Sequence, residues 1–274
     1  MKYVRFCFIG VALFLLAGCF QVETVVRVNP DGSGTVEERM LFSKKILAQF
    51  EAMMQGFAGE GNAKPQTMEL FDPNKLKAQA ESMGEGVIYI SGEKVVTDKY
   101  SGYKATYAFT DINKLRLSRQ NGGSAGEAAG GAKPPAVPIL FNFTKGSPAT
   151  LTIEMPKEAT AATATDTPAA APSADTAKMS EEEAKKLTEL FHGLKFLLAI
   201  EVNGNIIETN AGHRDGNRLT LADFDLEKFG NALPQLEKLS GLNGRSMEEA
   251  KVLLKDFPGI KMEMNEKLKV VFGK

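Results

Sequence analysis

Apolar and polar residues alternate in several segments of the chain, which is the pattern of β-strands that bury one face. Residues 102–110 show it clearly, because Tyr103, Ala105, Tyr107 and Phe109 fall on one side of such a strand. The same reasoning predicts further strands, the last of them interrupted at Glu266: residues 22–28, 35–42, 87–97, 196–202, 206–210, 219–221 and 260–272.

Two segments carry hairpin signals as well. Residues 138–156 contain two alternating runs on either side of the turn Lys145–Pro148, which predicts a β-hairpin. Asn203-Gly204 is a favoured two-residue turn, so the strands at 196–202 and 206–210 are expected to pair with each other.

Four segments are predicted to be helices instead. A stripe of apolar residues at helical spacing predicts a helix from Lys44 to Phe57; its members are Ile46, Leu47, Phe50, Met53, Met54 and Phe57. Asp72-Pro73 opens a second helix. Capping boxes, Ser180 with Glu183 and Ser246 with Glu249, start two more. We therefore expect an α+β fold, with a mostly antiparallel sheet built from hairpins and with amphipathic helices packed on it.

Two stretches are rich in Gly, Ala, Thr and Pro and poor in large apolar residues. They cover residues 120–137 and 157–179. Such sequences bury too little surface to offset the entropy of ordering, so both are expected to be flexible. The α+β domain would then consist of residues 19–119 and 180–274, with the hairpin at 138–156 between the two flexible segments.

The N-terminus has the organisation of an export signal. Lys2 and Arg5 precede an apolar run, Phe6 to Leu16, which is shorter than a comfortable membrane span of ~20 residues. A short buried helix is the alternative interpretation. The run ends in Leu16-Ala17-Gly18-Cys19, which resembles the lipobox of bacterial lipoproteins.

The lipobox resemblance implies a specific modification and address. Residues 1–18 would be removed as a signal peptide, and Cys19 would carry a diacylglyceryl thioether and a fatty acyl chain such as palmitate on its amine. Two or three chains anchor a protein durably, whereas one is marginal. Phe20, in place of Asp, favours the outer membrane in a cell with two membranes, facing the periplasm or the surface.

Cysteine content and charge exclude several kinds of site from the remaining chain. The two cysteines are Cys7, inside the signal, and Cys19, under lipid. That leaves no thiol for a disulfide, a thiolate zinc site or a nucleophile. Removal of Lys2 and Arg5 with the signal changes the net charge from −1 to −3. A protein with this net charge is not expected to bind nucleic acid. No cofactor or metal is predicted.

Residues 28–38, VNPDGSGTVEE, resemble a calcium-binding loop at first sight. With Gly32 at the sixth position of an EF-hand loop, Asp31 and Glu38 match, but Arg27 takes the place of the first acidic ligand. The flanking segments also have strand patterns instead of helical ones. Pro30-Asp31-Gly32 is therefore predicted to form a tight turn.

Catalytic candidates are weak. Gly122–Gly126 satisfies G-x-S-x-G around Ser124, but it lies in a flexible segment and not at a strand-to-helix turn. His192 is expected at a helix end, where a cation suits the helix dipole. His213 with Asp215 and a serine would make a triad only if the fold placed them in one cleft. We predict that the protein is not an enzyme.

Two segments resemble the LppM-type family of bacterial lipoproteins. They are VETVVRVNPDGSGTVEERMLFS, residues 22–43, and LAIEVNGNIIETNAGHRDGNRLTL, residues 198–221. The resemblance implies an envelope lipoprotein with an α+β domain. It transfers no catalytic residue, because the shared positions are turn formers and strand residues.

The short distance from Cys19 to the first predicted strand suggests where the protein works. About three extended residues span roughly 10 Å, so the domain would sit against the bilayer. We expect a non-enzymatic binding or assembly module that contacts envelope lipids or membrane-proximal proteins through its sheet edges or the central hairpin. One alternative is a carrier or sensor of lipid, with the helix at 44–57 covering an apolar cavity; a hydrolase is a remote second.

Overall fold

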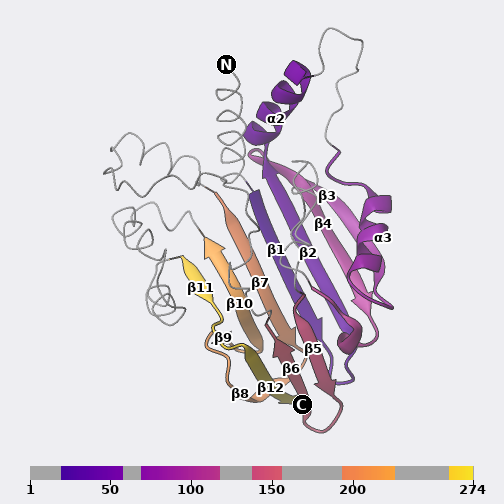
Figure 1. Cartoon of the computed structure of the whole chain (residues 1–274), viewed down its shortest axis with the longest axis vertical. Helices are drawn as coiled ribbons and strands as arrows, with labels where there is room; N and C mark the ends of the chain where they lie inside the picture. The colour runs from indigo at the N-terminus through magenta and orange to yellow at the C-terminus, as the bar shows by residue number, and fades with distance from the viewer. Residues whose placement is uncertain (1–19, 58–68, 118–137, 156–192, 226–258, 274) are drawn as a thin grey trace, which may run out of the picture.

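A computed structural model describes residues 20–57, 69–117, 138–155, 193–225 and 259–273. These residues form two β-sheets, two α-helices and a short 3-10 turn (Figure 1). The larger sheet has the strand order β11-β10-β7-β1-β2-β4-β3, with β9 paired to β10, and the smaller one has the order β5-β6-β12-β8.

The strands of the larger sheet are β1 (Phe20–Val28), β2 (Gly34–Ser43), β3 (Ile88–Val96), β4 (Tyr100–Phe109), β7 (Lys195–Val202), β9 (Arg214–Asp215), β10 (Arg218–Asp225) and β11 (Ile260–Met262). Those of the smaller sheet are β5 (Leu140–Thr144), β6 (Ala149–Glu154), β8 (Asn205–Thr209) and β12 (Lys267–Gly273). The helices are α2 (Lys44–Phe57) and α3 (Pro73–Ser82), and the 3-10 turn is η1 (Ile112–Lys114).

β1 lies in the interior of the larger sheet. It pairs antiparallel with β2 and parallel with β7, so that Val26 stands between Val36 and Ile200. All three side chains are fully buried. The pairing of β1 with β7 joins two parts of the chain that are far apart in sequence.

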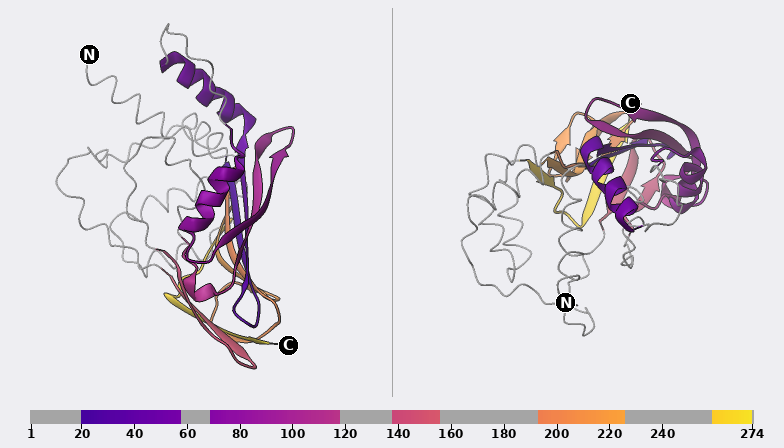
Figure 2. Two further views of the ribbon diagram at one scale, coloured as in Figure 1. Left: turned by 90° about the vertical axis from the view of Figure 1, so that its right-hand side faces the viewer. Right: turned by 90° about the horizontal axis from the view of Figure 1, so that it is seen from above.

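The smaller sheet packs across the lower part of the larger one, and the hydrophobic core fills the space between them (Figure 2). Leu151, Ile153 and Phe272 of the smaller sheet are completely buried. Phe143 of β5 lies with its ring centroid 6.3 Å from that of Phe272. A burial of this extent supplies most of the driving force for folding.

The two helices relate to the larger sheet in different ways. α3 begins where the sequence predicts, because the side chain of Asp72 accepts a hydrogen bond from the Asn74 amide. It buries Leu76 and Ala80 beside β3. α2 instead continues from β2 past the end of the sheet (Figures 1 and 2). Neither helix is long and apolar enough to cross a membrane.

The expected α+β class is wrong. Strands dominate the described residues, the larger sheet is mixed because β1 and β7 run parallel, and α2 covers neither sheet face. Periodicity reports only which residues share a face, and the parallel pairing is set by contacts that no local pattern contains. The helices predicted from Ser180 and Ser246, and the segments 120–137 and 157–179, lie outside the described residues.

The hairpin predicted around Asn203-Gly204 is also wrong. β7 pairs with β1 and β10, whereas β8 pairs with β12, so the chain passes from one sheet to the other at this turn. Gly204 has φ +154°, and a Cβ there would lie 2.5 Å from the carbonyl oxygen of Gly273. Glycine is needed because the two backbones approach so closely.

The strand predicted over residues 260–272 is split in the same manner. Its first part is β11, at the edge of the larger sheet, and its second part is β12, inside the smaller one. Other local predictions are confirmed. Residues 138–156 contain the predicted hairpin, formed by β5 and β6, with Phe141 opposite Ile153.

Candidate functional site

Several of the residues singled out by sequence lie outside the described ranges. This applies to Leu16, Ala17, Gly18 and Cys19 of the lipobox, and also to Ser124 and His192. Phe20 is the first described residue and also the first residue of β1. The strand therefore starts directly after Cys19, two residues earlier than the alternation predicts.

The turn at residues 28–38 is present and uses its polar groups internally. The Gly32 amide donates to the Asn29 carbonyl at 3.0 Å, and Gly32 has φ +90°. The Ser33 amide and hydroxyl both donate to Asp31 Oδ1, at 2.9 and 2.7 Å, and these bonds hold the pKa of Asp31 below its usual value. Asp31 thus closes the turn, as the sequence predicts.

Glu38, at the twelfth position of the calcium-loop alignment, is not positioned as a calcium ligand. It lies on β2 with its side chain turned into the core, and only 2% of its surface is exposed. Within the described ranges no group of three or more His, Cys, Asp and Glu residues is placed to hold a metal ion.

Glu38 is the centre of a buried polar cluster below α3. Tyr103 of β4 donates its hydroxyl to Glu38 Oε1 at 2.6 Å. Gln79 of α3 donates Nε2 to both carboxylate oxygens, at 3.1 and 3.0 Å. A buried carboxyl needs such partners because its desolvation is otherwise costly. The cluster therefore ties one helix and two strands together.

Burial dominates the electrostatics of this cluster. It raises the pKa of Glu38, while the hydrogen bonds from Tyr103 and Gln79 act in the opposite direction. Burial and the charge of Glu38 also raise the pKa of Tyr103 and of Tyr107. The Tyr107 hydroxyl is buried and has no hydrogen-bond partner in the described part of the chain.

This arrangement suits a structural tie better than a reactive site. Glu38, Tyr103 and Tyr107 are 2%, 5% and 0% exposed, so a substrate has no direct access to them. Sequence reasoning missed the cluster, although a signal existed. Val36, Glu38 and Met40 occupy one face of a single strand, which places a charged residue at an inward position.

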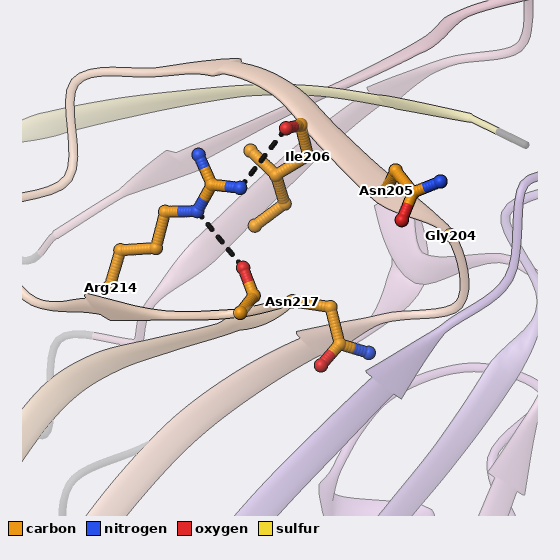
Figure 3. A pocket seen from close by; sticks show the side chains of 6 residues that line it. Gly204, Asn205, Ile206, Arg214 and Asn217 are labelled. Atoms are coloured by element: carbon orange, nitrogen blue, oxygen red, sulfur yellow. Dashed lines mark hydrogen bonds between the residues drawn. The ribbon is translucent and has the colours of Figure 1, made fainter.

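An open pocket of about 570 Å³ lies where β8 faces the β9–β10 hairpin (Figure 3). Its lining consists of Gly204, Asn205, Ile206, Arg214, Gly216 and Asn217. Arg214 donates Nη2 to the Ile206 carbonyl at 3.1 Å and Nε to the Gly216 carbonyl at 2.9 Å. The guanidinium thus holds two backbone segments at a fixed separation.

The pocket does not assemble the triad considered from sequence. His213 and Asp215 are absent from its lining, although Arg214 between them takes part. The His213 carbonyl accepts the amide of Thr220 at 2.9 Å, as a residue of an ordinary hairpin does.

Charged residues form a continuous network of ion pairs on the face of the larger sheet that points away from the core. Glu201 of β7 accepts from Arg27 of β1 at 2.8 Å and from Arg218 of β10 at 2.7 Å, and Arg27 also pairs with Glu37 of β2. Partial burial would raise the pKa of Glu201, but the two guanidinium groups outweigh it and lower that pKa. This network links four neighbouring strands.

Comparisons with known proteins give little further information. No protein-family model matches the chain, and no curated protein matches its sequence. Among solved structures, the NMR structure of the folded domain of the LppM protein of Mycobacterium tuberculosis is similar, with 10% sequence identity and a TM-score of 0.35 over 94% of this chain and 92% of that one. The chain is thus distantly similar in structure to an LppM protein, a likeness that transfers no role.

Proposed function

We propose that the protein is a lipid-anchored envelope lipoprotein whose β-domain acts at the bilayer surface as a non-enzymatic binding or assembly module. The observation that carries this proposal is the start of β1 at Phe20, directly after the cysteine of the lipobox-like sequence.

Chain geometry leads from this observation to the location. The Cα atoms of neighbouring residues are ~3.8 Å apart, so an acylated Cys19 would leave no linker between the lipid and the sheet. β1 is an interior strand, paired on both sides along its length. The domain cannot move away from the headgroups without breaking the sheet, so its partners would be lipids or proteins near the membrane.

The free edge of the larger sheet supports a binding role. In the described part of the chain β3 pairs with β4 alone, and Ile88 and Ile90 on β3 are 58% and 53% exposed. An open strand with exposed apolar residues can pair with a strand of another protein. The β5 edge of the smaller sheet is a second such place, where Leu140 is 39% exposed.

The alternative of a lipid carrier loses the observation on which it rested. It required α2 to cover an apolar cavity, whereas α2 extends past the end of the sheet (Figure 2). The pocket beside Arg214 is open and lined with polar groups as well as Ile206, so it does not replace that cavity.

Replacement of one cysteine tests the anchoring. Cys19→Ser should abolish cleavage of residues 1–18 and the acyl modification, both read by mass spectrometry of detergent-extracted protein. Cys7→Ser is the matched control, because it removes the other cysteine from within the signal and should leave processing unchanged. A Cys19→Ser chain that is processed and partitions with membranes like the parent would refute the proposal.

A cross-linking experiment tests the binding role. Photoreactive residues placed at Ile88 or Ile90 should capture a defined envelope partner in cells, whereas the same residue at Lys77 on α3, also exposed, should not. Equal capture at all three positions would contradict the use of this edge.

A further inference from the structure

The end of the larger sheet next to Cys19 finishes in an apolar row. Phe20, Phe42, Ser101 and Val96 stand side by side on β1, β2, β4 and β3. The ring centroids of Phe20 and Phe42 are 5.5 Å apart, and both side chains are half-buried. Val96 is 56% exposed. Three of the four positions are therefore apolar at a place where the core no longer covers them fully.

Three exposed lysines lie just beyond this row. Lys44 and Lys45 form the first turn of α2, and Lys99 lies at the tip of the β3–β4 hairpin. The Lys44 amide donates to the Lys99 carbonyl at 2.9 Å, which joins the two segments. Asp98 is the one carboxylate in residues 43–45 and 97–100, so these segments carry a net charge of +2 (three Lys minus one Asp).

The three lysines are not engaged in ion pairs within the described residues. Lysines elsewhere on the domain often are: Lys114, Lys195 and Lys267 pair with Glu85, Asp225 and Glu154. The positive charge at this end is thus available to an external anion.

The opposite end of the domain has no such excess of positive charge. The turns at residues 29–33, 84–87, 110–114 and 145–148 meet there, as shown by the contact of Gly32 with Phe143 and of Gly84 with Lys114. They contain Asp31, Glu85 and Asp111 against Lys114 and Lys145, and Arg116 donates to the Asn113 carbonyl beside them, so the net charge is zero (two Lys and one Arg minus three acids). Positive charge is therefore concentrated at the end where the chain emerges from residue 19.

We propose that the sheet end formed by residues 43–45, 97–100 and the Phe20–Val96 row is a docking surface for anionic lipid headgroups. The proposal rests on the proposed anchoring at Cys19 and adds the orientation and the lipid chemistry. The lysine ammonium groups would contact headgroup phosphates, while their methylene stems and the apolar row lie against the headgroup–acyl boundary. Each lysine at an anionic surface strengthens binding about fivefold.

Lysine footprinting of the intact lipidated protein tests the orientation. The protein would be reconstituted in nanodiscs of phosphatidylcholine, with or without phosphatidylglycerol, and treated with an acetylating reagent. Lys44, Lys45 and Lys99 should react about fivefold more slowly in the anionic discs, and added salt should restore their reactivity. Lys145, at the far end, should not change. Equal rates in the two kinds of disc would overturn the proposal.

Charge reversal supplies the matched comparison. Lys44→Glu, Lys45→Glu and Lys99→Glu together should remove the lipid-dependent hydrogen-exchange protection of residues 97–100. Lys75→Glu, Lys77→Glu and Lys145→Glu make the same change in net charge at other exposed positions and should retain it. Thermal melts of both variants check folding. Protection that survives in the first variant as in the second would contradict headgroup binding.

The failure of anchoring and the failure of docking can be told apart. Mass spectrometry of the N-terminal peptide reports acylation of Cys19 independently of the lysines. If Cys19 proves unmodified, the anchoring proposal fails, and docking is then measured by flotation of the unmodified chain with phosphatidylcholine–phosphatidylglycerol vesicles. Salt-sensitive flotation that the first triple variant weakens about 100-fold or more would support docking. No flotation would refute it.

Discussion

The side chain of Gln79 on α3 donates to both carboxylate oxygens of Glu38 on β2, at 3.1 and 3.0 Å. This contact fixes the helix to the sheet through a polar group inside an apolar layer. Because Glu38 is almost fully buried, water cannot replace a lost partner easily. Stability should therefore depend on this pair more than on the charges at the surface.

Gln79→Ala should lower the free energy of unfolding by about 1–3 kcal/mol, because it leaves a buried carboxyl with fewer donors. Urea denaturation measures the change. Lys77→Ala on the exposed side of the same helix is the control and should alter stability by less than about 0.5 kcal/mol. Equal effects of the two substitutions would show that the contact with Glu38 contributes nothing specific.

The pH dependence of stability should reveal the state of Glu38. Burial raises its pKa above the ordinary value of 4.5, so the folded state binds the proton more tightly than the unfolded state. This group therefore favours folding at low pH, and its contribution declines as the pH rises from the unfolded pKa to the folded one. Glu38→Gln should remove that decline.

The measurement is the difference in unfolding free energy between Glu38→Gln and the parent, followed from acid to neutral pH. The difference should shift in favour of the variant as the pH rises above about 4.5. A difference that stays constant with pH would mean that Glu38 titrates normally.

Glu201 should show the opposite sign. The guanidinium groups of Arg218 and Arg27 outweigh burial and lower its pKa, so its stabilising contribution is present above the unfolded pKa and is lost as the pH falls through the folded pKa. Glu201→Gln should cost about 1 kcal/mol at neutral pH, by urea denaturation, and nothing in strong acid. Glu208→Gln, whose ion pair with Lys269 is well exposed, should have little effect at either pH. A cost for Glu201→Gln that persists in acid would argue against the ionic network.

Gly204 and Gly216 both have a positive φ, and alanine substitutions at them distinguish the cost of backbone strain from the cost of a steric clash. Gly204→Ala should destabilise by more than about 2 kcal/mol, because its Cβ would collide with the Gly273 carbonyl. Gly216 has φ +57° and open space around it. Gly216→Ala should therefore lower stability only by the cost of the left-handed conformation, about 1 kcal/mol. Thermal melts rank the two variants. The reverse order would contradict the close contact between Gly204 and β12.

The sequence predicts which segments are strands, because alternation such as that of Tyr103, Ala105 and Tyr107 is a local property. It also predicts the start of α3 at Asp72, where one side chain caps the helix. Partners are not local, and the errors concern partners: Asn203-Gly204 connects two sheets instead of closing a hairpin, and β1 pairs with a strand from late in the chain.

The candidate sites also differ in whether their contacts are local in sequence. The turn around Asp31 could be predicted because its hydrogen bonds span only a few residues. The cluster at Glu38 draws on three separate elements, so the sequence offered only a charge at an inward strand position. The lipobox-like sequence, although specific, lies outside the described residues and stays a prediction.

The interior position of β1 has a mechanical consequence for an anchored protein. A pull on Cys19 would act along the axis of β1, against the ladders with β2 and β7 at once. Both rows of hydrogen bonds would then bear the load in shear and share it, whereas an edge strand pulled sideways would unzip one bond at a time. Attachment at this strand would let the domain withstand a pull from the membrane that would peel apart a sheet attached through an edge strand.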